Sequence, residues 1–170
     1  MKIAFGYKMG AGKDTCADYI IKNKGGIKLS FSHPLYDILE YAQKTCGFST
    51  GKDRQFLQMI GTWARDKNPD VWIDLFKEKV QICRSEYEHV NIVNSDVRFL
   101  NEFESLKKQG FTMIKIKRTL VDSSRAGTGS SYHISEMELD SLNDDSWDFV
   151  IDNDGSLDDL YVKLDNICRG

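Results

Sequence analysis

The sequence contains no closely spaced cysteines and no long hydrophobic runs. Its 4 cysteines, at positions 16, 46, 83 and 168, form no CxxC or CxxH pattern. This spacing argues against a cysteine-ligated metal site and favours reduced thiols in an intracellular, cytoplasmic protein. No apolar segment approaches the roughly 20 residues that cross a bilayer, and the first one breaks at Gly6. We therefore expect neither a signal peptide nor a membrane partner.

An excess of basic residues is also missing. The 23 Lys and Arg are outnumbered by 26 Asp and Glu, which gives a net charge of −3. Proteins that bind nucleic-acid polymers usually carry a strong basic excess, so we expect no such partner, although small basic clusters can still bind a mononucleotide. The 170 residues contain no repeat, low-complexity segment or interdomain linker. A single domain spanning residues 1–170 is the prediction.

What the sequence does contain is a glycine-rich segment, GYKMGAGKDT (6–15), directly after the strand-like KIAF. Glycines allow backbone N–H groups to approach phosphate oxygens. A lysine can reach the β- and γ-phosphates, and the N-terminus of a following helix faces the negative charge. The segment predicts a phosphate-binding loop for a nucleoside triphosphate. Its candidate nucleotide-binding residues are Lys8, Gly10, Ala11, Gly12, Lys13, Asp14 and Thr15.

This segment departs from the pattern G-x-x-x-x-G-K-[ST] at two positions. Lys13 places the first glycine at position 7, which is Tyr7, and Asp14 stands where serine or threonine is usual, with Thr15 next. The alternative is an ordinary strand-to-helix turn with a solvated lysine. The strand-like residues before the loop and the apolar helical face over 16–21 favour the phosphate-binding loop.

Apolar runs and helical patterns alternate along the chain. Strands are predicted at 2–6, 27–32, 90–95, 112–117 and 148–152. Helical spacing appears between them, over 35–46, 72–83 and 100–106, and a last helix is capped by Ser156. This alternation predicts a three-layer α/β/α sandwich of the P-loop NTPase type, around a five-stranded parallel sheet. Ligand loops should then gather at the carboxyl ends of the strands.

Two segments exceed what the crossovers need. About fifty residues of helical pattern separate the second and third strands, and we assign an acceptor-binding insert to 33–88. The Ser-, Gly- and Thr-rich stretch over 120–136 predicts a LID-like flap at about 119–133, which carries Arg125 and ends near His133. An insert and a flap can cover an acceptor and exclude water, which would otherwise hydrolyse the γ-phosphate.

Other candidate site residues follow the third strand and occupy the insert. Asp96 and Arg98 come at a carboxyl edge, where Asp96 can support magnesium or orient an acceptor and Arg98 can bind phosphate. A helix-capping aspartate with a surface arginine is the alternative.

A polar helical face within the insert is a further candidate, because it can bind an acceptor, although it can also simply be solvated. That face consists of Arg54, Gln58, Thr62 and Arg65.

Two aromatic side chains complete the candidates for substrate binding. Trp72 begins the next helix, and a core position explains it better than a stacking platform. His133 can contact phosphate or cap the next helix.

With these pieces assembled, the chain resembles the deoxynucleoside monophosphate kinase family of phages and large DNA viruses. The likeness covers most of the chain and rests on segments in family order: GAGKDT (10–15), FSHPL (31–35), RQFLQMIGTWAR with NPDVWI (54–73), SDVRFLNE (95–102), HISE (133–136) and DFVIDNDGSLDDL (148–160). Animal-type phosphomevalonate kinases are similar in the GKD loop and the D-x-R segment. A non-catalytic nucleotide-binding module is the remaining alternative.

The resemblance implies transfer of the ATP γ-phosphate to a (deoxy)nucleoside 5′-monophosphate, with Mg²⁺, in the host cytoplasm if the chain is viral. It implies that Lys13 and the glycines hold ATP, and that Thr15 with Asp14 or Asp96 supports the metal. Arg54, Arg65 and Arg98 become candidates for the acceptor phosphate, and Arg125 and Lys8 for contact with the transferred group. The base, the sugar and the formation of homodimers stay open.

Overall fold

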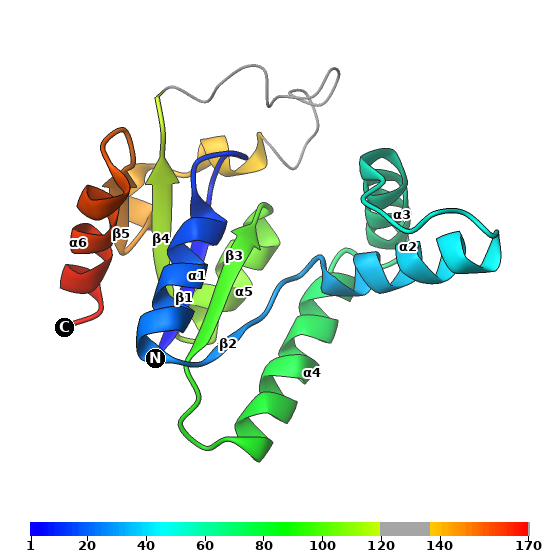
Figure 1. Ribbon diagram of the computed structural model, residues 1–170, viewed down its shortest axis with the longest axis horizontal. Helices are drawn as coiled ribbons and strands as arrows, with labels where there is room; N and C mark the ends of the chain where they lie inside the picture. The colour runs from blue at the N-terminus through cyan, green and yellow to red at the C-terminus, as the bar shows by residue number, and fades with distance from the viewer. Residues whose placement is uncertain (120–136, 170) are drawn as a thin grey trace.

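The computed structural model describes residues 1–119 and 137–169. Figure 1 shows the order of its elements. They are β1 (Lys2–Gly6), α1 (Lys13–Lys24), β2 (Ile27–Lys28), α2 (His33–Thr45), α3 (Arg54–Lys67), α4 (Val71–Glu86), β3 (Ile92–Val97), α5 (Leu100–Lys108), β4 (Thr112–Lys117), the 3₁₀ turns η2 (Glu138–Ser141) and η3 (Asp144–Ser146), β5 (Phe149–Asp152) and α6 (Leu157–Ile167).

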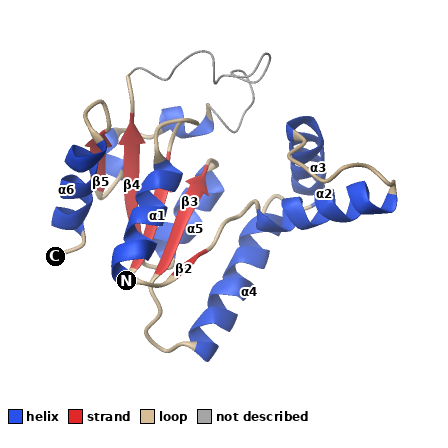
Figure 2. Cartoon of the chain, in the orientation of Figure 1, coloured by secondary structure: helices blue, strands red, loops and turns tan. Residues whose placement is uncertain are grey.

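The strands form one five-stranded sheet in the order β2-β3-β1-β4-β5, and every neighbouring pair is parallel. This confirms the predicted parallel sheet. Because the strands run the same way (Figure 2), their carboxyl ends share one edge. β1 lies at the centre, so the loop that follows it leaves the sheet between the ends of β3 and β4.

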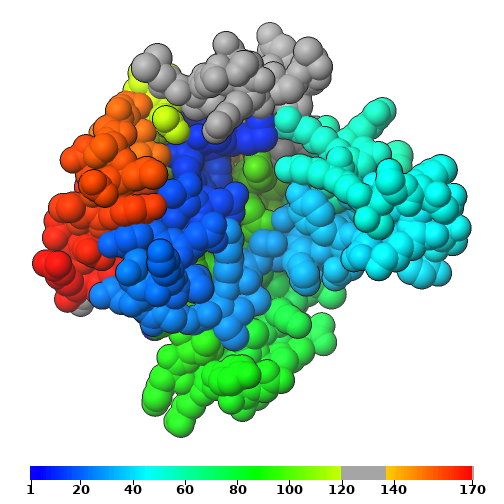
Figure 3. Space-filling model, viewed as in Figure 1, coloured from blue at the N-terminus to red at the C-terminus, as the bar shows by residue number. Residues whose placement is uncertain are grey.

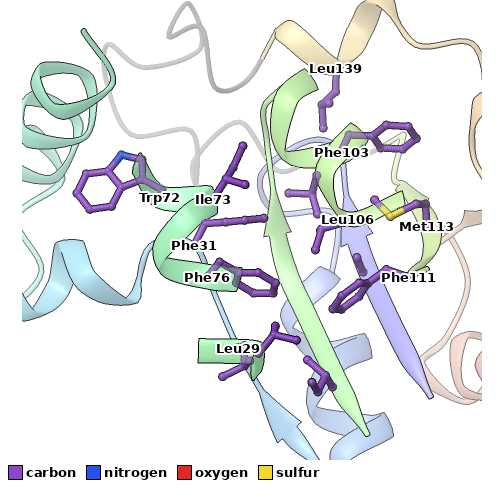
Figure 4. Packing of buried hydrophobic residues seen from close by; sticks show 14 of the residues in the cluster. Leu29, Phe31, Trp72, Ile73, Phe76, Phe103, Leu106, Phe111, Met113 and Leu139 are labelled. Atoms are coloured by element: carbon purple, nitrogen blue, oxygen red, sulfur yellow. The ribbon is translucent and has the colours of Figure 1, made fainter. Parts of the chain in front are cut away.

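Helices cover both faces of this sheet, which accounts for the near-continuous apolar strands. Alternate side chains of β1 point to opposite faces. Ile3 and Phe5 pack with α1 and α6, whereas Ala4 packs with α4 and α5. Figure 4 shows the second of these cores, in which Phe76 of α4 lies beside Phe31. The three-layer α/β/α sandwich is thereby confirmed.

β2 is shorter than the predicted strand over 27–32. Its ladder continues only to Leu29, whose N–H donates to the Val93 carbonyl at 2.9 Å. Beyond that point side chains of β3 replace the backbone ladder. The Asn94 amide donates to the Leu29 carbonyl at 3.2 Å, and Asp96 accepts from the N–H of Phe31 at 3.1 Å. These side-chain bonds turn the chain away from the sheet and toward α2.

The long insert divides into two parts. α4 packs against the sheet, whereas α2 and α3 pack against each other at the side of the molecule, away from β4, β5 and α6 (Figure 1). Figure 3 shows the α2–α3 part, in cyan and teal, projecting beside the body of the protein. Of the predicted apolar face of α2, Leu35 and Leu39 are buried, while Ile38 and Cys46 are exposed. We call residues 33–67 the α2–α3 insert.

The ends of two helices agree with simple capping rules. Asp53 accepts from the N–H of Phe56 at the start of α3. Ser156 and Asp159 form a reciprocal capping box at the start of α6, as the sequence predicts. Within the described residues, no helix combines the length and the apolar character needed to cross a membrane.

Candidate active site

The glycine-rich segment joins β1 to α1, which is the strand–loop–helix order that a phosphate-binding loop requires. Three of its residues have positive φ: Tyr7 (95°), Gly10 (76°) and Gly12 (102°). Lys13 is the first residue of α1, and Gly12 precedes it as the N-cap in the left-handed conformation. The backbone N–H groups at the start of α1 and the adjoining loop therefore gather near the ends of β1 and β3.

Tyr7 occupies the place of the first glycine of the pattern and adopts the backbone conformation that favours glycine. A left-handed φ costs a non-glycine residue about 1–2 kcal/mol. Contacts of the side chain oppose this cost. The ring packs against the core, and the Lys115 ammonium lies 4.3 Å from the ring centroid. Lys115 is itself buried and bonded to Asp144 at 3.0 Å. The surrounding structure thus holds the strained residue in place.

Lys13 is buried within the loop, with only 6% of its surface exposed. Its ammonium donates to the carbonyl of Tyr7 at 3.0 Å and to the carbonyl of Lys8. A buried cation needs such partners to replace water. The bonds hold the cation against the loop, beside the backbone groups that would surround a polyphosphate.

Asp14 connects the loop to two neighbouring strands. Its carboxylate accepts from the Ser95 hydroxyl of β3 at 2.7 Å and pairs with Lys28 of β2 at 3.0 Å. Partial burial opposes ionisation, but the bond from Ser95 and the bond and charge of Lys28 outweigh it and lower the pKa of Asp14. Asp14 therefore presents an ionised carboxylate at the first turn of α1.

Both carboxylate oxygens of Asp96 accept hydrogen bonds from the backbone. Oδ1 accepts from Phe31 at 3.1 Å and from the Asn94 amide at 2.8 Å, and Oδ2 accepts from Ser32 at 3.0 Å. Asp96 thus fixes the chain just before α2. Asp96 therefore fixes the start of the insert. This role resembles the helix-capping role that the sequence analysis gave as the alternative for Asp96.

Arg65 is bound to a buried carboxylate. Its guanidinium donates to Glu102 at 3.0 Å and lies 3.8 Å over the ring of Phe99. Glu102 also accepts from the backbone N–H of Arg98 at 2.9 Å. Burial raises the pKa of Glu102 to about 7, although the charge of Arg65 opposes the rise. The pair joins α3 to the segment that follows β3.

The other end of α3 approaches the phosphate loop. The Arg54 guanidinium lies 3.4 Å from the sulfur of Met9. Gln58 and Thr62 lie farther along this helix, and Thr62 is exposed. Trp72 is a core residue, because it is 4% exposed and its indole N–H donates to the Gly61 carbonyl at 3.3 Å.

The structure brings most of the predicted loop residues to one edge of the sheet, together with Asp96 and the N-terminal end of α3. The side chains of Arg65 and Trp72 are engaged elsewhere, with Glu102 and Gly61. Arg125 and His133 lie outside the described residues.

Sequence reasoning did not identify four residues of this region: Lys28, Ser95, Glu102 and Asn153. Ser95 and Asn153 stand at the carboxyl ends of β3 and β5, where the rule used for Asp96 applies equally. No local pattern indicates the roles of Lys28 and Glu102. Within residues 1–119 and 137–169, no three His, Cys, Asp or Glu side chains are grouped so that they could hold a metal ion.

A model of the deoxynucleotide monophosphate kinase family matches residues 52–164. The chain is 28% identical over 180 residues to a putative deoxynucleotide monophosphate kinase of Acanthamoeba polyphaga mimivirus, with 91% of this chain and 89% of that protein covered. It is 28% identical over 124 residues to the deoxynucleotide monophosphate kinase of Escherichia phage RB69, with 68% and 44% covered.

A third relative is uncharacterized protein ORF77 of Ictalurid herpesvirus 1 (strain Auburn). It is 33% identical over 144 residues, which cover 84% of this chain and 60% of that protein. The chain thus spans about three fifths of the length of ORF77 and under half of the phage enzyme. In fold, it is similar to a gluconokinase from Sinorhizobium meliloti 1021, with a TM-score of 0.53 at 15% identity over 99% of this chain and 91% of that one.

Proposed function

The chain belongs to the deoxynucleotide monophosphate kinase family, and from that membership we propose that it transfers the γ-phosphate of ATP to a deoxynucleoside 5′-monophosphate. An oxygen of the acceptor phosphate attacks the γ-phosphorus. The bond from that phosphorus to the β–γ bridging oxygen breaks, and ADP leaves. The observation that carries the proposal is the phosphate loop with Lys13 held against it at the N-terminus of α1.

The loop supplies what a phosphate donor needs. Phosphoryl transfer requires little covalent chemistry from the protein, but it requires positioning and charge neutralisation. The positive end of α1 and the backbone N–H groups of the loop would face the β-phosphate. On ATP binding, the Lys13 ammonium would exchange its carbonyl partners for β- and γ-phosphate oxygens. A cation held nearby needs little rearrangement to do so.

The residues at the start of α1 also fit Mg²⁺. This ion takes hard oxygen ligands and is usually held by one or two carboxylates together with substrate phosphates. Asp14 is ionised and largely exposed at the first turn of α1, with the hydroxyl of Ser95 beside it. When bound, the ion would neutralise charge on the β- and γ-phosphates. We propose Asp14 and Thr15 as its protein ligands ahead of Asp96, whose oxygens accept three hydrogen bonds.

The acceptor would bind between the phosphate loop and the α2–α3 insert. Arg54 is the leading candidate for its phosphate, because the guanidinium already reaches Met9 of the loop. Gln58 and Thr62 follow on the same helix, and Arg98 follows β3. For Arg65 we propose a different role: its bond to Glu102 would hold α3 against the core. Arg125 and His133 remain candidates from the sequence alone.

The test is an assay of ADP release from ATP and Mg²⁺ against a panel of deoxynucleoside and ribonucleoside monophosphates, with mevalonate 5-phosphate included. Turnover with one or more deoxynucleoside monophosphates supports the proposal and defines the base range. Turnover with mevalonate 5-phosphate alone would replace the acceptor. ATP binding without turnover of any acceptor would contradict the proposed activity.

A further inference from the structure

The turn between β5 and α6 contacts the phosphate loop from the distant end of the chain. Its residue Asn153 is 8% exposed, and its side-chain amide donates to the carbonyl of Ala11 at 2.8 Å. Neither the glycine pattern of the loop nor the proposed chemistry accounts for this buried contact between residues 142 positions apart.

The contact determines the orientation of one peptide group. The carbonyl of Ala11 and the N–H of Gly12 belong to the same planar, trans peptide, so they point in opposite directions. When the Ala11 carbonyl is bound to Asn153, the Gly12 N–H is directed away from Asn153. That N–H is one of the backbone donors of the phosphate loop.

Gly12 and Asn153 also depend on each other sterically. A Cβ at position 12 would lie 2.5 Å from the Nδ2 atom of Asn153, and the φ of Gly12 is +102°. Only glycine both adopts this backbone conformation and leaves room for the amide. Gly12 is therefore needed for the contact with Asn153 as well as for the approach of the backbone to phosphate.

The turn that carries Asn153 is fixed on both sides. The backbone N–H of Asn153 donates to the Lys117 carbonyl at 2.7 Å, which extends the β4–β5 ladder by one residue. The next residue, Asp154, accepts from the N–H and the hydroxyl of Thr119 at 2.7 and 2.6 Å. The amide is thus presented to the loop from the end of the sheet, which gives it little freedom to follow the loop if the loop moves.

We propose that Asn153 is a positioning residue, which orients the Ala11–Gly12 peptide so that the Gly12 N–H faces the polyphosphate of the nucleotide. This role rests on the proposed function, since it requires that the loop bind a polyphosphate. It deepens that function by making the donor site depend on a side chain from the β5–α6 turn.

The experiment measures dissociation constants of Mg·ATP and of inorganic tripolyphosphate for the full chain and for Asn153→Ala. Tripolyphosphate has no base or sugar, so it isolates the phosphate loop. We expect both ligands to bind about tenfold more weakly to Asn153→Ala, the change that corresponds to the loss of roughly one hydrogen bond in a buried site. Asn153→Asp should weaken both further, because a carboxylate oxygen would face the Ala11 carbonyl.

A matched control is available at the other end of α1. Asn91 also donates from its side chain to backbone carbonyls, those of Lys24 and Gly25, at 3.0 and 3.3 Å. Asn91→Ala should lower the melting temperature but leave both dissociation constants unchanged. If Asn153→Ala does not fold, Asn153→Asp is the test variant, because it keeps the size of the side chain and replaces the donor with an acceptor.

Three outcomes would overturn the inference. Binding of both ligands that is unchanged in the folded Asn153 variants would show that the contact does not set the loop. Weaker binding of ATP alone would indicate a contact with the base or sugar. A wild-type chain that binds neither ligand would contradict both the inference and the proposed function. By contrast, ligand binding without turnover of any monophosphate would contradict only the proposed function.

Discussion

In the phosphate loop a charged side chain is turned inward, whereas in the α2–α3 insert some large apolar side chains are turned outward. Lys13 is buried and bonded to loop carbonyls, and Ala11 is bonded to Asn153. In the insert, Met59 and Trp63 are 57% and 59% exposed. This part is attached to the core through the buried Leu35 and Ala64 and also through polar contacts, among them the Arg65–Glu102 pair and the bonds of Asp96.

This difference fits the proposed function, in which the loop binds the phosphate donor and the insert binds the acceptor. Local stability follows the density of buried contacts, so the loop should be rigid and the insert easier to displace. A preformed loop suits a phosphate donor that always presents the same polyphosphate group. An insert that is attached partly through polar contacts can adjust its distance from the loop when an acceptor binds.

The largest expected effect tests the donor side. Lys13→Ala should lower turnover by about two to three orders of magnitude, because it removes a positioned charge at the transition state. The measurement is turnover with saturating acceptor, together with circular dichroism. Lys22→Ala, at the exposed C-terminal end of the same helix, is the control and should keep normal turnover. A folded Lys13→Ala variant with near-normal turnover would contradict the role of the loop.

The attachment of the insert should depend on pH. Burial raises the pKa of Glu102 from 4.5 to about 7, with the charge of Asp96 adding to the rise and that of Arg65 opposing it. Between these values the folded chain binds more protons than the unfolded chain. The free energy of unfolding should therefore fall as the pH rises toward 7, by at most about 1.4 kcal/mol per pH unit, and then level off.

Urea unfolding at several pH values measures this dependence. Glu102→Gln should flatten it below pH 7, since the variant has no carboxyl group at this position. Glu104→Gln is the matched control, because Glu104 is exposed on the same helix and its replacement should leave the slope unchanged. Equal slopes in the wild type and Glu102→Gln would rule out Glu102 as the source.

A smaller effect tests the strain at Tyr7. Tyr7→Ala and Tyr7→Gly both remove the ring contacts, but only alanine keeps the cost of positive φ. The glycine variant should therefore be more stable than the alanine variant by about 1 kcal/mol. Tyr87 supplies the control, because its φ is −138°, and there alanine should be no less stable than glycine. The same order of stability at both positions would contradict the strain.

The smallest effect is expected on the outward face of the insert. Trp63→Ser and Met59→Ser should change the free energy of unfolding by no more than about 0.5 kcal/mol, because both side chains are exposed. Phe76→Ala, in the core beside the sheet, should cost about 3–5 kcal/mol. A loss above about 1 kcal/mol for Trp63→Ser that varies with protein concentration would show that a second copy covers this face.

Most of the fold could be predicted from local patterns. The alternation of apolar runs and helical spacing identified all five strands, and the glycine segment identified the loop. β2 was predicted too long because its end is decided by Asn94 and Asp96, which lie 65 residues beyond Leu29 and Phe31. A strand pattern contains no information about such distant competitors for backbone groups.

The candidate site was predicted less completely for the same reason. Helical spacing placed Arg54 and Arg65 on one face of α3, but spacing does not identify partners. Arg54 reaches the phosphate loop, whereas Arg65 pairs with Glu102. Tyr7 is the instructive case: its departure from the glycine pattern was visible in the sequence, but only the structure shows that the backbone keeps the glycine conformation.

The central place of β1 has a consequence for how the protein folds. Lys2 pairs with Ile92 and Ile3 pairs with Thr112, so this strand can be completed only after the chain beyond both neighbours is available. Such non-local pairing slows folding, because distant segments must meet before they gain contacts. Asn153 lies farther still along the chain. During synthesis the phosphate loop should therefore mature only after Asn153 has emerged from the ribosome, 142 residues after Ala11.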